Sequence, residues 1–127
     1  MTPLFSSQSW GFYPSAQHKT LYWHHRGSTL PSAVGSSLLC YGRGRSYGDS
    51  CLNDQAYILS TQYLDHFLNF DAKAGILRCE AGVTLESILN LIVAQGWFLP
   101  VTPGTRFVSV GGAIANDIHG KNHHCEG

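Results

Sequence analysis

The 127-residue chain contains 43% hydrophobic residues and only 13% charged residues, and its formal net charge is zero. This length and apolar content are enough for one compact domain with a core of its own. The balanced charge argues against a protein that binds the phosphates of nucleic acid, because such proteins contain an excess of Lys and Arg. No nucleic-acid partner is therefore expected.

The N-terminal residues 1–37 are rich in Ser, Gly, Pro and aromatic residues, and we interpret them as an arm that precedes a domain spanning residues 38–127. Within the arm, Thr20–His25 favours a short strand, and Leu30–Gly35 favours a short helix after Pro31. The aromatic residues expected to pin this arm onto the rest of the chain are Trp10, Phe12 and Tyr13.

Short apolar runs in the middle of the chain predict strands. Leu38–Tyr41 and Tyr57–Ser60 are typical of buried strands that feed into loops. His66–Phe70 and Ile76–Ala81 flank the polar turn DAKAG, which is the pattern of a hairpin. The alternation of the second arm places Leu77, Cys79 and Ala81 on one face.

The clearest helix is predicted over Thr84–Gln95. Thr84 is a favourable N-cap, and Gly96 can end the helix in the left-handed conformation. One apolar stripe is formed by Leu85, Ile88, Leu89, Ile92 and Val93. Phe98–Val101 then favours a strand, so strand, helix and strand suggest a βαβ unit. The predicted fold class is α/β, a small sheet with flanking helices.

The segment GRGRSYGDS, which follows the strand at Leu38–Tyr41, is the first of two glycine-rich loops. Its glycines expose backbone amides, Ser46 adds a hydroxyl donor, and Arg43 and Arg45 add positive charge, a combination that suits a diphosphate. The loop lacks the GxxxxGK[ST] pattern of a P-loop, and its third glycine is one residue late for the dinucleotide fingerprint. A tight surface turn is the alternative interpretation.

The second loop starts at the turn Pro103–Gly104. Ser109 is placed to cap a short helix that runs from Val110 to about Asn116, with Gly111 and Gly112 in its first turn. Glycine is unfavourable in a helix. The pair therefore suggests a ligand that lies against this backbone, with free amides aimed at an anion or a carbonyl.

The C-terminal histidines leave three interpretations open. A zinc site could use His119, His123, His124 and Cys125, although the chain has no CxxC or HExxH pattern. A solvated polar terminus is the second interpretation. The third is an organic cofactor lined by His119 and the pair Lys121–Asn122.

The four cysteines, Cys40, Cys51, Cys79 and Cys125, show no spacing typical of a small disulfide framework. We therefore expect free thiols in a reducing compartment. The N-terminus lacks the basic and apolar pattern of a signal peptide, and the longest apolar stretch is interrupted by polar residues, so no membrane span is predicted.

Taken together, GRGRSYGD, PGT and VGGAIANDIHGKNHH resemble the flavin-binding half of the vanillyl-alcohol oxidase/p-cresol methylhydroxylase (PCMH) superfamily. Within it, they are most similar to the bacterial decaprenylphosphoryl-ribose 2-oxidase group. The resemblance implies FAD as cofactor. The residues that the resemblance places around the diphosphate are Gly42, Arg43, Gly44, Arg45, Ser46, Tyr47 and Gly48. Those along the diphosphate and ribityl chain are Gly104, Thr105, Ser109, Val110, Gly111 and Gly112. Those near the flavin ring are Asn116, Asp117, Ile118, His119, Lys121 and Asn122.

In many superfamily members a histidine at the position of His119 is bonded to the flavin, whereas in the most similar group the cofactor is non-covalent, which is the state expected here. The implied reaction is oxidation of a sugar or alcohol hydroxyl to a ketone, on a sugar or lipid-linked sugar substrate. No metal is implied. The relatives of that group act at the cell envelope, so the compartment is expected to be the cytoplasm or the inner-membrane and periplasmic region.

Members of this superfamily are several hundred residues long. We therefore expect this chain to be the N-terminal part of the FAD-binding domain, without the substrate domain or a catalytic residue. The surface around Gly104–Ile118 would then be exposed and apolar, which favours self-association or a C-terminal partner chain. Two alternatives to an oxidoreductase part are a non-enzymatic module that binds a partner chain and a small metal-binding protein.

Overall fold

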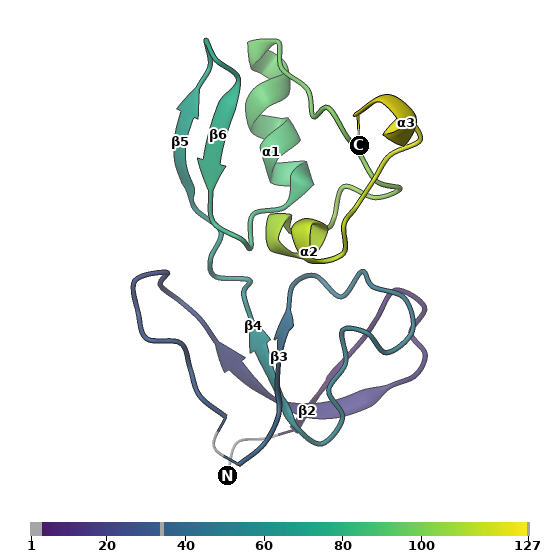
Figure 1. Cartoon of the computed structure of the whole chain (residues 1–127). Coiled ribbons are helices and arrows are strands. Elements are labelled where there is room, and N and C mark those ends of the chain that lie inside the picture. The colour runs from purple at the N-terminus through teal and green to yellow at the C-terminus, as the bar shows by residue number, and fades with distance from the viewer. Residues whose placement is uncertain (1–3, 34, 127) are drawn as a thin grey trace. The chain divides into compact units, whose positions relative to one another are not determined.

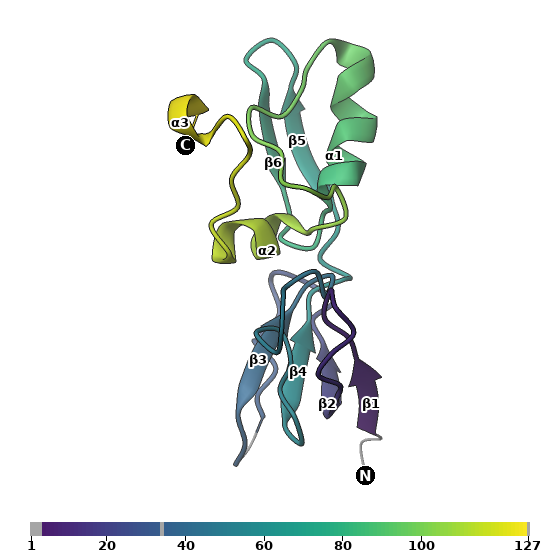
Figure 2. The same cartoon turned by 90° about the vertical axis from the view of Figure 1, so that its right-hand side faces the viewer.

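A computed structural model describes residues 4–33 and 35–126 of the chain (Figure 1 and Figure 2). The chain divides into two compact units, Met1–Leu64 and Asp65–Gly127. Among the described residues, the first unit consists of strands and loops, and the second contains a hairpin and the helices. Small sheets and short helices are the fold class that the sequence predicts.

The first unit is a four-stranded sheet in the order β1-β2-β4-β3. Its strands are β1 (Leu4–Ser7), β2 (Ala16–Tyr22), β3 (Leu38–Tyr41) and β4 (Tyr57–Ser60). β1 is antiparallel to β2, while β4 runs parallel to both β2 and β3 (Figure 2). The predictions for β3 and β4 are confirmed, and the predicted strand of the N-terminal arm lies earlier, in β2.

The core of the first unit is centred on β4. Ile58 and Leu59, which point to opposite faces of the sheet, are almost completely buried, and β4 has a parallel neighbour on each side. A strand buried on both faces needs a continuous apolar run rather than an alternating pattern. The run YIL supplies it.

His18 on β2 is a polar exception in this core. It is completely buried, and neither ring nitrogen has a hydrogen-bond partner among the residues that the structure describes. Burial lowers the pKa of the ring below its ordinary value, and this effect outweighs the opposing influence of the Asp54 carboxylate. His18 is therefore held neutral in the folded unit.

We expect the first unit to lose stability between about pH 7 and about pH 5, and His18→Phe to reduce that loss. The unfolded ring takes up a proton once the pH falls below the ordinary pKa of 6.5, whereas the folded ring resists protonation. The unfolded state then binds more protons, so acid favours unfolding by at most about 1.4 kcal/mol per pH unit. Urea unfolding of both proteins at the two pH values measures this difference. Equal pH dependence in the two proteins would exclude His18 as its source.

The second unit begins with the predicted hairpin, β5 (Phe67–Asp71) and β6 (Ile76–Cys79), whose strands are antiparallel. The Asp71 carboxylate accepts hydrogen bonds from the amides of Lys73 and Ala74, each 3.0 Å long, and these bonds shape the turn. The Trp97 indole donates to the Ala72 carbonyl over 2.8 Å and thereby ties the chain after the helix to this turn.

Helix α1 (Leu85–Ile92) packs against the hairpin (Figure 1). The Thr84 hydroxyl accepts a hydrogen bond from the Ser87 amide at 3.1 Å, which confirms the predicted N-cap. A single 3₁₀ turn, η1 (Val93–Gln95), extends the helix to Gly96, which has the left-handed φ of 83°. The core of the unit consists of Val83, Leu85, Ile88 and Ile92.

Two further helices complete the second unit: α2 (Val110–Ala115) and α3 (His123–Glu126). The prediction of α2 with its Ser109 cap is confirmed, and α3 was not predicted. None of the helices in residues 4–33 and 35–126 has the length and apolarity that a membrane span requires. The four cysteines are free thiols, as predicted.

Several local predictions are wrong. The described residues of Leu30–Gly35 form no helix, because the segment has no apolar face to bury and Leu30 itself is exposed. Phe98–Val101 forms no strand, so there is no βαβ unit in the part of the chain that the structure describes. Pro100 lacks an amide, and its carbonyl accepts instead from the Asn122 side chain.

Two groups of side chains are also more exposed than predicted. The aromatic residues expected to pin the arm, Trp10, Phe12 and Tyr13, are all exposed. Val93 is 52% exposed, so the apolar stripe of α1 ends at Ile92. Val93 follows the last residue of α1 and begins η1.

Candidate functional site

The loop Gly42–Gly48 in the first unit is shaped by a close approach at Gly44. This residue is buried and has a φ of 63°, a conformation that side chains disfavour. A Cβ atom at this position would collide with the Tyr41 hydroxyl and the Gln8 carbonyl oxygen. These two groups hydrogen-bond to each other over 2.9 Å, so only glycine fits beside them.

The backbone amides of this loop are largely unused. The Ser46 carbonyl accepts a hydrogen bond from the Trp10 amide at 3.0 Å, which holds the loop against the residues after β1. The amides that take part in no hydrogen bond among the described residues are those of Gly42, Arg43, Gly44, Tyr47 and Gly48. Successive free amides next to residues of positive φ are an arrangement that binds anions. These loop amides therefore form no hydrogen bond within the described residues, which agrees with the ligand-binding loop that the sequence suggests.

Positive charge dominates the side chains of the loop. Arg43 and Arg45 are exposed, and the Arg45 guanidinium lies 5.8 Å from the centre of the Trp10 ring. Burial raises the pKa of the Cys51 thiol, although hydrogen bonds from Ser46 oppose the shift. Burial likewise raises the pKa of the Tyr41 phenol. Both groups stay neutral at neutral pH, so neither cancels the charge of the arginines.

In the second unit, the start of α2 differs from the prediction. The amides of Val110 and Gly111 donate to the carbonyls of Val83 and Ala81, each over 2.8 Å. The Gly112 amide donates to the Ser109 hydroxyl at 3.2 Å. The first three amides of α2 are therefore occupied within the chain, and the prediction of free amides aimed at a ligand is wrong.

Close packing explains the first glycine of the pair. A Cβ atom at Gly111 would lie 3.0 Å from the Ala81 Cβ and 3.2 Å from the Ala81 carbonyl oxygen. Both contacts are tighter than ordinary van der Waals packing. Gly111 therefore allows α2 to rest directly on the backbone that precedes α1.

The end of α2 is closed by Asp117. The Asp117 amide donates to Ile114 at 3.2 Å and the Ile118 amide to Ala113 at 3.1 Å, which together form a Schellman motif. Asp117 occupies the left-handed position with a φ of 46°, where glycine is the usual residue. The motif directs Ile118 back onto the core, where it is partly buried.

Asp117→Val is expected to lower the free energy of unfolding of the second unit by about 1–2 kcal/mol, because a β-branched residue is strained at positive φ. Asp117→Gly adopts the same conformation without strain and is expected to match or exceed the wild-type stability. Urea unfolding followed by circular dichroism compares the three proteins. Equal stability of the Val and Gly variants would contradict this account of the helix end.

The remaining predicted residues of the second unit lie around the segment after α2. His119 and Lys121 are exposed, and a ring nitrogen of His119 lies 3.2 Å from the Asp117 carbonyl oxygen. Gly104 is exposed, and the Thr105 hydroxyl accepts from the Phe107 amide at 3.2 Å. The Asn122 side-chain amide donates to the Pro100 carbonyl at 2.9 Å. His119 and Lys121 thus remain available to a ligand, while the Asn122 amide group is already engaged.

The C-terminal histidines form a ring cluster. The His123 ring centre lies 5.6 Å from that of His119 and 4.0 Å from that of His124. Across the described residues, no group of three or more His, Cys, Asp or Glu side chains is arranged to hold a metal ion. The geometry therefore gives the zinc interpretation no support.

Sequence reasoning missed the residues that support the two loops. Tyr41 and Gln8 lie against Gly44. The carbonyls of Ala81 and Val83 accept the first two amides of α2. A signal for Tyr41 exists in the sequence, since an aromatic hydroxyl directly precedes the glycine loop. The small residues Ala81 and Gly82 before α1 are also a sign of close backbone contact.

A family model described as an FAD binding domain matches residues 29–127. The chain belongs to this family. The match covers both glycine-rich segments and confirms the resemblance to flavin-dependent oxidoreductases that the sequence predicts.

Among curated relatives, the chain is 40% identical over 93 residues to decaprenylphosphoryl-beta-D-ribose oxidase of Mycolicibacterium smegmatis, covering 73% of this chain and 20% of that protein. It is 39% identical over 70 residues to L-gulonolactone oxidase 5 of Arabidopsis thaliana, covering 55% of this chain and 12% of that protein. The chain thus spans a fifth or less of the length of these relatives.

Solved structures show the same fold. Cholesterol oxidase from Brevibacterium sterolicum superposes with a TM-score of 0.65 at 16% identity, covering 93% of this chain and 25% of that chain. At this identity the likeness concerns the fold alone. It confirms the predicted architecture of small sheets with flanking helices.

Proposed function

We propose that this chain binds FAD non-covalently and that the loop Gly42–Gly48 holds the diphosphate. The observation that carries the proposal is the set of unbonded amides in this loop, beside two exposed arginines. The fit is favourable because a diphosphate needs several donors and positive charge, and the neighbouring Tyr41 and Cys51 remain neutral. Membership of the family supplies the identity of the cofactor.

The second unit is proposed to contact the flavin through the segment Asn116–Asn122 and through Gly104 and Thr105. Exposed His119 and Lys121 support this role. Helix α2 would contribute an apolar surface rather than hydrogen-bond donors, because its first amides are bonded within the chain.

Bound FAD would supply a hydride acceptor for the oxidation of an alcohol, and the residues of this chain would bind and orient it. The names of two relatives refer to oxidases of sugar-derived compounds. We therefore propose that the complete protein oxidises a hydroxyl of a sugar or lipid-linked sugar to a ketone. Within this chain, Arg43 and the loop amides would hold the diphosphate, and His119 and Lys121 would border the flavin.

The proposal is tested by titrating the purified chain with FAD and following flavin fluorescence or the heat of binding. Arg43→Gln is expected to weaken binding about tenfold, because it removes a charge-assisted contact to phosphate. Arg78→Gln, which removes an exposed arginine on β6, is the matched control and should leave the affinity unchanged. Acid precipitation then separates the two modes of attachment, since non-covalent flavin stays in the supernatant. A chain that binds no FAD would overturn the proposal.

One observation favours a second candidate, a contact with another polypeptide. Ile114 on α2 is 76% exposed, and Phe98 is also exposed. Large exposed apolar side chains can mark interaction sites. Light scattering at increasing protein concentration, compared with Ile114→Ser, tests self-association. A wild-type chain that stays monomeric, alone and with a candidate C-terminal partner, would exclude this candidate.

A further inference from the structure

Glu80, directly after β6, is a buried residue whose carboxylate contacts His66. Its Oε2 atom accepts from the His66 backbone amide at 3.0 Å and lies 2.7 Å from the His66 Nδ1 atom. The Glu80 amide donates in return to the His66 carbonyl at 2.9 Å. An ionised carboxylate can only accept hydrogen bonds, and with Glu80 in that state the His66 Nδ1 atom is the donor.

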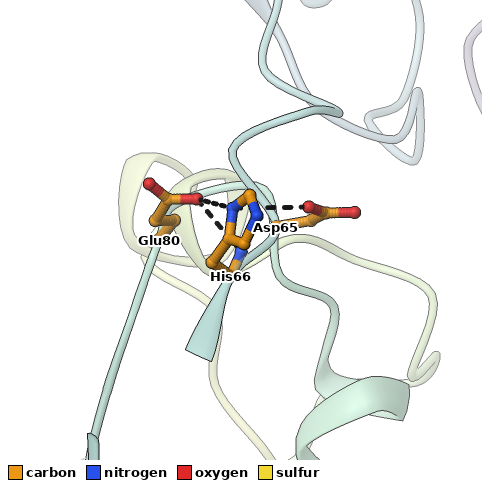
Figure 3. Close-up of polar contacts among 3 residues, drawn as sticks. All are labelled: Asp65, His66 and Glu80. Atoms are coloured by element: carbon orange, nitrogen blue, oxygen red, sulfur yellow. Dashed lines mark hydrogen bonds and ion pairs between the residues drawn. The ribbon is translucent and has the colours of Figure 1, made fainter. Parts of the chain in front are cut away.

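The burial of the two partners is unequal. The Glu80 side chain is 5% exposed, whereas the His66 side chain is 66% exposed. Figure 3 shows the imidazole between Glu80 and Asp65, whose carboxylate is the more distant, at 3.8 Å. Removing the histidine ring would leave a buried carboxylate without one of its donors, and such a group is costly to keep in place.

The backbone around Glu80 also forms hydrogen bonds that hold α2 in place. The Val83 amide donates to the Glu80 carbonyl at 3.2 Å and closes the turn between β6 and α1. The carbonyls of Ala81 and Val83, in this same turn, accept the first two amides of α2. Glu80 is therefore joined to Gly111 by the peptide bond to Ala81 and one hydrogen bond.

We infer that His66 and Glu80 are positioning residues that hold the start of α2 in the conformation needed to contact FAD. The inference rests on the proposed FAD binding. The Glu80 carboxylate holds the turn, and the Ala81 and Val83 carbonyls in this turn accept the Gly111 and Val110 amides at the start of α2. Neither residue touches the cofactor in this account.

The exposure of His66 makes the inference testable. His66→Ala removes a mostly exposed ring and opens no cavity in the core, so a residue without a positioning role would change little. We expect hydrogen exchange of the Val110 and Gly111 amides to accelerate about tenfold in this variant, with exchange in the interior of α1 unchanged. FAD affinity is expected to fall about tenfold as well.

His66→Asn provides the rescue, because the side-chain amide nitrogen of Asn can occupy the position of Nδ1 and donate to Glu80. It should return exchange and affinity to within about threefold of wild type. Asp65→Asn is the matched control on the other side of the ring and should behave as wild type. Unchanged exchange in His66→Ala, equal acceleration of all amides, or failure of His66→Asn to rescue would each overturn the inference. If the wild-type chain binds no FAD, the proposed function fails and the FAD role fails with it, while exchange at Val110 and Gly111 still decides whether His66 and Glu80 hold α2.

Discussion

Gly44→Ala is expected to lower the free energy of unfolding of the first unit by about 3 kcal/mol and to abolish measurable FAD binding. The added Cβ would displace the Tyr41 hydroxyl or the Gln8 carbonyl, which hydrogen-bond to each other. The positive φ of 63° adds backbone strain to this collision. Urea unfolding measures the stability, and titration with FAD measures the affinity.

Gly48→Ala is the matched control in the same loop. Gly48 has a similar φ of 57°, but a Cβ atom there would meet nothing within 4 Å. Only the backbone strain remains, and it should cost roughly 1 kcal/mol. The difference between the two variants therefore isolates the contact with Tyr41 and Gln8. Equal loss of stability in both would contradict the close approach at Gly44.

The comparison of these glycines shows what the sequence could predict of the loop. A strand that ends in closely spaced glycines predicts a loop with unbonded amides, and several amides of this loop form no hydrogen bond within the described residues. The reason for Gly44 could not be predicted, because Gln8 is distant in sequence and reaches the loop only through the sheet. Local sequence patterns predict local conformation, whereas contacts between segments that are distant in the sequence depend on the whole fold.

The same distinction applies to the second unit. The hairpin, the Thr84 cap and the Ser109 cap follow from short-range chemistry, and each is confirmed. The prediction of a strand at Phe98–Val101 was wrong because strand formation needs a pairing partner, which an apolar run alone does not guarantee. The contact between the His66 ring and the Glu80 carboxylate could not be predicted from the sequence either, since the two residues meet only once the hairpin has formed.

The glycines of α2 show how one pattern supports two explanations. A glycine pair at the start of a helix suggests free amides for a ligand, but these amides are bonded within the chain. The structure gives Gly111 a different reason, its contact with Ala81. The two explanations predict different results when a side chain is added at Gly111 and the methyl group of Ala81 is removed.

Gly111→Val is expected to lower the free energy of unfolding of the second unit by about 2–3 kcal/mol. Its side chain would press on the Ala81 Cβ and carbonyl oxygen and separate α2 from the turn that carries it. Adding Ala81→Gly removes the methyl group on the other side of this contact, and we expect it to restore about half of the loss. Urea unfolding of the two single variants and the double variant completes the cycle.

The outcome for FAD separates the two roles of Gly111. If the residue serves packing, the affinity for FAD should recover in the double variant together with stability, because α2 returns to its support. If a ligand needs bare backbone at this position, the double variant regains stability but still binds FAD weakly, since the valine side chain remains. Strictly additive effects of the two substitutions would show that Gly111 and Ala81 are not coupled, and they would contradict the packing explanation.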